Sequence, residues 1–168
     1  MALLKIIHHP NPNLRIVAAP VTTFDEKLQT IIDDMYETMY HAHGAGLAAT
    51  QVDIHLRLAV MDVNPEKPNP ICMINPEIIH SEGEQIDQHG CLSLPGVPGD
   101  RIKRAATLRV RALDRHGNPF EFDATETLAI CVQHEIDHLN GKLYIHHLSP
   151  LKQERLIKKG EKYKARSN

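Results

Sequence analysis

The apolar residues between positions 128 and 143 recur at the spacing of a helix. They lie three or four positions apart, which places them on one face that can pack against a core; they are Leu128, Val132, Ile136, Leu139 and Leu143. Asp123, followed three positions later by Glu126, is predicted to cap the start of this helix in a capping box. Gly141 is predicted to end it.

A second apolar stripe predicts an earlier helix. Its members are Leu28, Ile31, Ile32, Met35 and Met39, and we interpret the methionines as core residues. Thr23 with Glu26 is predicted to form the capping box of this helix. The helix is expected to end near residues 41–43, where His41 and His43 are interpreted as surface or turn residues.

After residue 57 the hydrophobic pattern becomes that of strands. Residues 57–63 and 71–75 are short apolar runs, and Pro76 is expected to break the second run or place it at a sheet edge. Apolar and polar residues alternate over 108–112, a turn is predicted at 114–117, and residues 120–122 return as the second arm of a hairpin. A helix, several strands and a helix in this order predict an α+β fold with antiparallel sheets.

The closing segment is predicted to be a basic helix. Ser149 is a suitable N-cap and Pro150 a suitable first helical residue. Such a helix can dock on an anionic surface such as RNA, and it is equally often a solvated helix with a frayed tail. Its cations are Lys152, Arg155, Lys158, Lys159, Lys162, Lys164 and Arg166, and its predicted apolar anchors are Leu151, Leu156 and Ile157.

Composition narrows the class of protein. The 168 residues suit one domain, and 42% hydrophobic with 24% charged residues is ordinary for a globular chain. A net charge of −2 does not indicate a nucleic-acid partner for the whole molecule. The sequence shows no apolar run of membrane-spanning length and no signal peptide. The odd count of 3 cysteines argues against a disulfide framework. We therefore expect a cytoplasmic protein with no membrane partner and no specific DNA binding.

The predicted helix at 128–141 carries the pattern H-E-x-x-H. Residues four positions apart share a helix face, so His134 and His138 present two imidazoles to one point. Glu135 is close enough to reach a water held there, which gives two metal ligands and a carboxylate that can move protons. The alternative is two surface histidines spaced by chance in a chain with 12 of them.

Two glycine-containing segments add candidate chemistry. In GAGLAATQ, residues 44–51, a pair of glycines lets the backbone run close to a ligand, and Gln51 offers an amide donor. A helix is expected before this segment, which argues against a dinucleotide-binding fingerprint. In GCLSLPG, residues 90–96, Cys91 is either a positioned thiol or an ordinary partly buried cysteine.

Together GAGLAATQ, GCLSLPG and QHEIDHLNG (133–141) resemble the three signature motifs of the peptide deformylases, in the same order and spacing. The closing basic helix is similar to that of the type I bacterial enzymes. The resemblance implies removal of the N-formyl group from formyl-methionine of newly synthesised proteins, with release of formate. It also implies antiparallel sheets wrapped around a central metal-binding helix. We expect a catalytic domain over 1–148, with the basic helix and tail, 149–168, packed on it.

The resemblance assigns roles to individual residues. It implies a metal held by Cys91, His134 and His138, with water in the fourth position and Glu135 as the general base and acid. We expect Fe²⁺, with Zn²⁺, Ni²⁺ or Co²⁺ as substitutes. The other implied residues are Gln51 and the Leu92 backbone N–H for the oxyanion, Gly44 and Gly46 for the substrate backbone, and Ile130 and Cys131 for the methionine side chain.

Three positions depart from the usual family pattern. His89 stands where glutamate is usual, Ala45 where a branched residue is common, and Thr127 where a leucine often lines the methionine pocket. None of the three is an implied metal ligand or catalytic group. We therefore expect an active enzyme, and the effect of the three departures on pocket shape and side-chain preference stays open.

Two other functions fit parts of the sequence. An H-E-x-x-H zinc endopeptidase would not need Cys91 and would take a downstream ligand such as His146 or His147. An RNA- or ribosome-binding module would use the basic C-terminal helix. Ribosome binding can coexist with deformylase activity, because an enzyme acting on formyl-methionyl nascent polypeptides benefits from being held near them.

Overall fold

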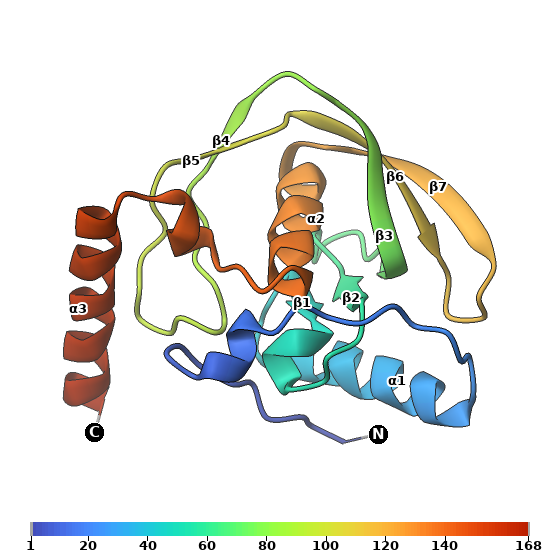
Figure 1. Cartoon of the computed structure of the whole chain (residues 1–168), viewed down its shortest axis with the longest axis horizontal. Helices are drawn as coiled ribbons and strands as arrows, with labels where there is room; N and C mark the ends of the chain where they lie inside the picture. Colours follow the sequence, from blue (N-terminus) through green and yellow to red (C-terminus); the bar gives the residue numbers. More distant parts are fainter. Residues whose placement is uncertain (1, 168) are drawn as a thin grey trace.

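A five-stranded antiparallel sheet and a smaller two-stranded sheet frame the molecule (Figure 1). The computed structural model describes residues 2–167, without the side chains of residues 164, 166 and 167. The larger sheet has the order β1-β2-β3-β6-β7, and β4 pairs with β5 in the smaller one. The strands are β1 (Gly46–Ala48), β2 (Leu58–Met61), β3 (Ile71–Glu82), β4 (Gln85–Asp87), β5 (Ile102–Arg104), β6 (Thr107–Leu113) and β7 (Pro119–Thr125).

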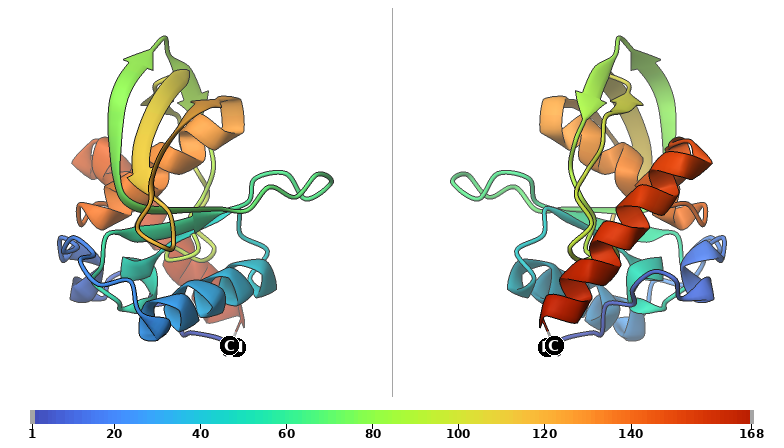
Figure 2. Two further views of the ribbon diagram at one scale, coloured as in Figure 1. Left: turned by 90° about the vertical axis from the view of Figure 1, so that its right-hand side faces the viewer. Right: turned by 90° about the vertical axis from the view of Figure 1, so that its left-hand side faces the viewer.

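One helix lies at the centre of these strands. Helix α2 contacts β1, β2, β5, β6 and β7, whereas α1 packs on β1 and β2, and α3 lies at the periphery (Figures 1 and 2). This arrangement confirms the predicted α+β fold with antiparallel sheets around a central helix. The helices are α1 (Glu26–His41), α2 (Glu126–Leu139) and α3 (Pro150–Ser167), and the 3₁₀ turns are η1 (Pro12–Arg15), η2 (Ala49–Val52) and η3 (Tyr144–His147).

Apolar side chains fill both sides of the larger sheet. Val132 and Leu139 of α2 pack with inward residues of β6 such as Val110. On the other side, Met35 and Met39 of α1 are fully buried against β2, which confirms their prediction as core residues. The central helix is thus held by packing along its length, which fixes the direction of its polar face.

Both predicted capping boxes were wrong. Helix α1 begins one residue after Asp25, whose carboxylate accepts a hydrogen bond from Leu28 N at 3.0 Å, so Thr23 is not the N-cap. Asp123 is a residue of β7, where it pairs with Arg109 of β6. Strand pairing therefore extends up to the start of α2. At the other end the prediction was right: Gly141 has φ +75° immediately after the cap residue Asn140.

Pro76 does not end its strand, contrary to the prediction. Strand β3 continues to Glu82, with a register shift against β6 between Ile74 and Glu77. Asn75 adopts φ +49° at this irregularity, and its side chain exchanges two hydrogen bonds with the backbone of Val21. The proline is accommodated because the ladder is interrupted there, as in a β-bulge. The predicted hairpin of β6 and β7 is confirmed.

The closing helix α3 begins as predicted, with Ser149 Oγ accepting from Lys152 N at 3.3 Å. Leu156 and Ile157 pack on the residues after Cys91, but Leu151 is 57% exposed and is not an anchor. The side chains of Lys164 and Arg166 lie outside the described residues. Within the described part of the chain, the structure contains no helix with the length and apolar character needed to cross a membrane.

Candidate metal centre

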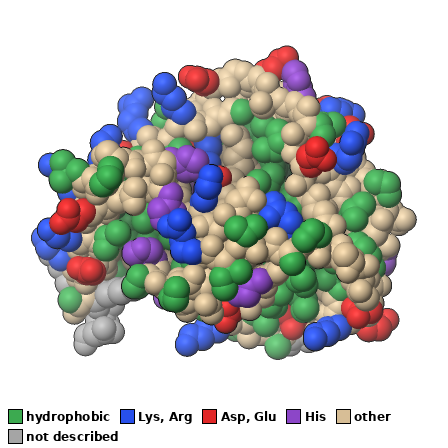
Figure 3. Space-filling view, in the orientation of Figure 1, with side chains coloured by type: hydrophobic (Ala, Val, Ile, Leu, Met, Phe, Trp, Pro, Cys, Tyr) green, Lys and Arg blue, Asp and Glu red, His purple; other side chains and the backbone are tan. Residues whose placement is uncertain are grey.

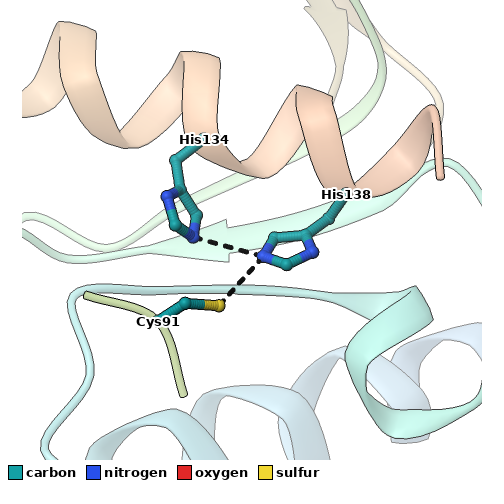
Figure 4. Close-up of side chains that lie close together, drawn as sticks. All are labelled: Cys91, His134 and His138. Atoms are coloured by element: carbon teal, nitrogen blue, oxygen red, sulfur yellow. Dashed lines mark hydrogen bonds between the residues drawn. The ribbon is translucent and has the colours of Figure 1, made fainter. Parts of the chain in front are cut away.

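Three donor atoms from two separate segments meet beside α2. His138 Nε2 lies 3.2 Å from Cys91 Sγ and 3.2 Å from His134 Nε2 (Figure 4). All three donor atoms lie within 4.8 Å of one another. The two histidines are one turn apart on α2, and Cys91 comes from the loop after β4, on the opposite side of the site. The structure therefore brings together the three ligands implied by the sequence.

Two of the three donor separations suit a tetrahedral metal ion. Metal–nitrogen and metal–sulfur bonds of about 2.0–2.3 Å place tetrahedral ligands about 3.3–3.8 Å apart. The two contacts of 3.2 Å are close to that range. A thiolate and two imidazoles are also donors that Zn²⁺ and other first-row divalent ions accept. The residues present therefore fit a divalent transition metal.

Burial keeps the two imidazoles in their metal-binding form. It lowers the pKa of His134 to about 4 and the pKa of His138 well below its usual value. Both rings are therefore neutral near pH 7, as a ligand must be. Burial raises the pKa of the Cys91 thiol to about 12, so a cation at this point is what would favour its thiolate.

Glu135 points its carboxylate at the same place from α2. The side chain is 3% exposed, and Oε1 has no hydrogen-bond partner among the described residues. Burial raises the pKa of this carboxyl to about 8. Gly46 lies against it: a Cβ there would come 2.5 Å from Oε2. A group that titrates near neutrality beside a metal site is suited to proton transfer.

A cavity of about 360 Å³ opens beside these groups. Every residue that the resemblance assigns to catalysis or substrate binding lines it, and so do the three positions that depart from the family pattern. His138 is the one implied ligand that does not line the cavity; it lies buried behind it. The lining includes Gly44, Ala45, Gly46, Gln51, His89, Cys91, Leu92, Thr127, Ile130, Cys131, His134 and Glu135.

Gln51 is fixed by three contacts at the cavity wall. Its Oε1 accepts from Ala48 N at 2.9 Å, while Nε2 donates to Ser93 Oγ at 3.1 Å and lies 3.6 Å from Cys91 Sγ. The Leu92 backbone N–H has no acceptor among the described residues. Sequence reasoning missed Ser93, although its place two residues after Cys91 was a usable signal.

The other histidines lie apart from this centre. His147 Nε2 is 2.8 Å from the carboxylate of Asp137, and His146 contacts Arg15 and the Leu143 N–H. His89 is exposed at the cavity mouth, with Nδ1 3.0 Å from Asp87. Within the described residues, the group suited to a metal contains none of these. Neither His146 nor His147 therefore belongs to the metal-binding group, as the endopeptidase alternative requires of its third ligand.

A Cys-His₂ donor set with a neighbouring glutamate on an H-E-x-x-H helix is typical of metallohydrolases. The comparisons with known proteins narrow this class. Residues 3–154 match the sequence model of the family described as "Polypeptide deformylase", and the chain belongs to that family. A peptide deformylase of Chromobacterium violaceum is 53% identical over 165 residues, which cover 96% of this chain and 98% of the relative.

Solved structures agree over nearly the whole chain. The crystal structure of a peptide deformylase from Legionella pneumophila superposes with a TM-score of 0.94 at 49% identity, covering 98% of this chain and 97% of that one. A peptide deformylase from Ehrlichia chaffeensis in complex with actinonin gives a TM-score of 0.92 at 38% identity, covering 97% and 98%. The fold expected from the resemblance is therefore the fold of the family.

Proposed function

We propose that this protein removes the formyl group from the N-terminal formyl-methionine of newly synthesised proteins. Membership of the peptide deformylase family supports this activity. The observation that carries the proposal is the position of Glu135, which lines one cavity together with Cys91 and His134 of the Cys91, His134 and His138 donor group. The reaction adds water to the formyl carbon, breaks the C–N bond and releases formate and a free amine.

The residues of the chain divide the chemistry between them. Cys91, His134 and His138 would hold a divalent metal, which would supply Lewis-acid chemistry for a water and a formyl carbonyl at this point. Glu135 accepts the proton that the water loses and returns one to the departing amine. Its raised pKa, about 8, suits both directions of transfer near neutral pH.

We propose that two N–H groups, those of Gln51 Nε2 and the Leu92 backbone, stabilise the developing oxyanion. The Leu92 N–H has no competing acceptor among the described residues. Gln51 Nε2 donates to Ser93 Oγ at 3.1 Å and to Cys91 Sγ at 3.6 Å, and we propose that the proton facing the sulfur turns to the substrate. Removing one donor of this kind typically costs about 10²–10³ in rate.

The substrate backbone is proposed to pair with the edge of the larger sheet. Within the described residues, strand β1 lies at the edge of the sheet and has β2 as its one neighbour. An extended peptide can add to such an edge through main-chain hydrogen bonds. Gly44 and Gly46 allow a close approach at this edge, and Ile130 and Cys131 of α2 offer an apolar wall for the methionine side chain.

We propose Fe²⁺ as the native metal, with Zn²⁺, Ni²⁺ and Co²⁺ as substitutes. The soft thiolate and two imidazoles accept all four ions. A thiolate-ligated ferrous site is expected to lose activity in air, whereas a Zn²⁺ site is not. Elemental analysis of protein isolated without oxygen, followed by activity before and after exposure to air, tests this assignment. Zinc as the main metal, with air-stable activity, would contradict it.

The activity itself is tested by formate release from a formyl-Met-Ala-Ser peptide. Fe²⁺-loaded protein should release formate, and Glu135→Gln should lower kcat by at least about 10²-fold, because general acid–base catalysis contributes that much. Glu126→Gln, in the exposed first turn of the same helix, is the matched control and should keep full activity. Casein cleavage without formate release from metal-loaded protein would instead support an endopeptidase.

We further propose that residues 149–168 belong to the same domain as residues 1–148. The buried contact of Leu156 supports a common domain.

We also propose that α3 docks the enzyme on the ribosome in the cytoplasm. Lysine side chains of α3 such as Lys152 and Lys159 are exposed, and Figure 3 shows basic and acidic side chains on the side of the molecule where α3 lies. Lys152→Glu with Lys159→Glu should weaken ribosome binding without changing peptide deformylation. Unchanged binding would refute the docking.

A further inference from the structure

Cys91 lies in a long irregular loop, yet its thiol must meet two histidines on a helix. The loop comprises residues 88–101 and connects β4 to β5 (Figure 1). Pairing within these two short strands spans only three residues each. Some further interaction must therefore set the position of this loop relative to α2.

A buried ion pair closes the base of the loop. Asp87 is the last residue of β4 and Arg104 the last residue of β5. They are diagonal neighbours on one face of the small sheet, because Asp87 pairs with Ile102 and Gln85 with Arg104. Arg104 Nε donates to Asp87 Oδ2 at 3.2 Å, and the two residues are only 5% and 1% exposed.

The same ion pair reaches the loop and the helix. Asp87 Oδ1 accepts from His89 N at 2.8 Å, two residues before Cys91. Arg104 Nη1 donates to Asp137 Oδ2 at 2.7 Å, and Asp137 directly precedes His138 on α2. One chain of charged hydrogen bonds thus runs from the backbone near the thiol to the helix turn that carries both imidazoles.

The energetics of this chain of hydrogen bonds indicate that it positions the groups it joins and adds little to stability. Removing two charges from water costs several kcal/mol, and a well-packed apolar replacement is often at least as stable. Charge-assisted hydrogen bonds, however, hold groups at defined distances and angles. Arg104 even leaves Nη2 buried without a partner among the described residues, a cost that packing alone does not explain.

We propose that Asp87 and Arg104 are positioning residues that hold Cys91 at the distance from His134 and His138 that the metal requires. The inference rests on the metal site of the proposed function. The proposal also accounts for the absence of the glutamate that is usual at position 89. The buried carboxylate of Asp87 stands two residues earlier in the sequence, and it also holds the imidazole of His89 at the cavity mouth.

The test measures the metal site directly. Co²⁺-loaded protein is compared by its visible absorption, which reports ligands and geometry, and by the rate at which a chelator removes Co²⁺. Asp87→Asn keeps the shape of the side chain and removes its charge. We expect altered absorption and metal loss faster by about tenfold to a hundredfold, the usual cost of removing a group that supports metal ligands. Asp34→Asn is the control, a buried carboxylate on α1 that accepts from Ala2 N.

A double-mutant cycle asks whether the two carboxylates act through Arg104 as one unit. Asp137→Asn breaks the other link of the chain and should give the same change as Asp87→Asn. The double variant should be little worse than either single one, because effects within one network are not additive. Additive effects on metal release would refute a common route through Arg104.

Several outcomes separate this inference from the proposed function. Folded variants with wild-type absorption and release rate would overturn it, even if their melting temperature falls. If Asp87→Asn does not fold, Asp137→Asn decides the question, since its side chain is 18% exposed and tolerates change better. If wild-type protein binds Co²⁺ but releases no formate when it is loaded with Fe²⁺, the result contradicts the proposed function and leaves the positioning inference intact. Wild-type protein that binds no Co²⁺ would contradict both.

Discussion

At the scale of single residues, Gly46 is the position where one methyl group has the largest expected effect on catalysis. A Cβ there would lie 2.5 Å from Glu135 Oε2 and 2.6 Å from Cys131 Sγ. Both are closer than side chains tolerate, so Gly46→Ala must displace the carboxylate that transfers the proton. We expect kcat/KM for formyl-Met-Ala-Ser to fall about 10²-fold, the effect typical of a 1 Å misplacement in an active site.

Gly44→Ala is the matched control for this prediction. A Cβ at Gly44 would meet Leu92 Cδ1 at 2.8 Å, the end of a flexible side chain that can move aside. Its loss of kcat/KM should therefore be several times smaller, with both variants folded by circular dichroism. Equal losses would show that contact with Glu135 is not the cause.

The sequence predicted local residue geometry better than distant partners. The spacing of His134 and His138 indicated their common face, because a helix fixes that relation locally. The meeting of Cys91 with them required the resemblance, since no local rule relates residues so far apart in the chain. The ion pair of Asp87 and Arg104 gave no signal at all, because which charges become buried together depends on how β4 pairs with β5 and how that small sheet packs against α2.

At the scale of elements, the start of α1 offers a clear test of the corrected cap. Asp25, rather than Thr23, accepts from the backbone of the first turn. Asp25→Ala should lower the free energy of unfolding by about 1 kcal/mol, the usual cost of losing an N-cap side chain. Thr23→Ala should change it by only a few tenths. Urea unfolding at neutral pH measures the free energy of unfolding of both variants. A larger loss for Thr23→Ala than for Asp25→Ala would show that Thr23 is the cap, as predicted from the sequence.

The elements missed by the sequence are those whose stability comes from their neighbours. The apolar stripe of α1 and the alternation in β6 are strong local signals, and both elements formed as expected. Strands β4 and β5 have three residues each, too few for a pattern, and they form because they pair with each other. Pro76 was misread for a related reason: the bulge that accommodates it depends on Asn75 bonding to Val21, far away in the chain.

At the scale of the whole molecule, the fold turns three distant segments into one site. The edge strand β1, the loop after β4 and the helix α2 contribute Gly46, Cys91 and Glu135 to a single cavity. Burial of that site changes the protonation of its ligands, so metal binding and pH should be linked. This linkage arises because the fold removes the metal-binding side chains from water.

The metal affinity should fall as the pH falls, by at least about tenfold for each pH unit, which is the linkage expected when at least one proton is released on binding. Between pH 5 and 7 the imidazole of His134, with its pKa lowered to about 4, and that of His138 are already neutral. The thiol of Cys91, with its pKa raised to about 12, still holds its proton and must lose it to bind metal. Competition between the protein and a chelator for Zn²⁺ at several pH values measures this slope. Cys72→Ser, which removes a thiol outside the site, should leave it unchanged. A slope near three protons would mean that both histidines are charged in the metal-free protein.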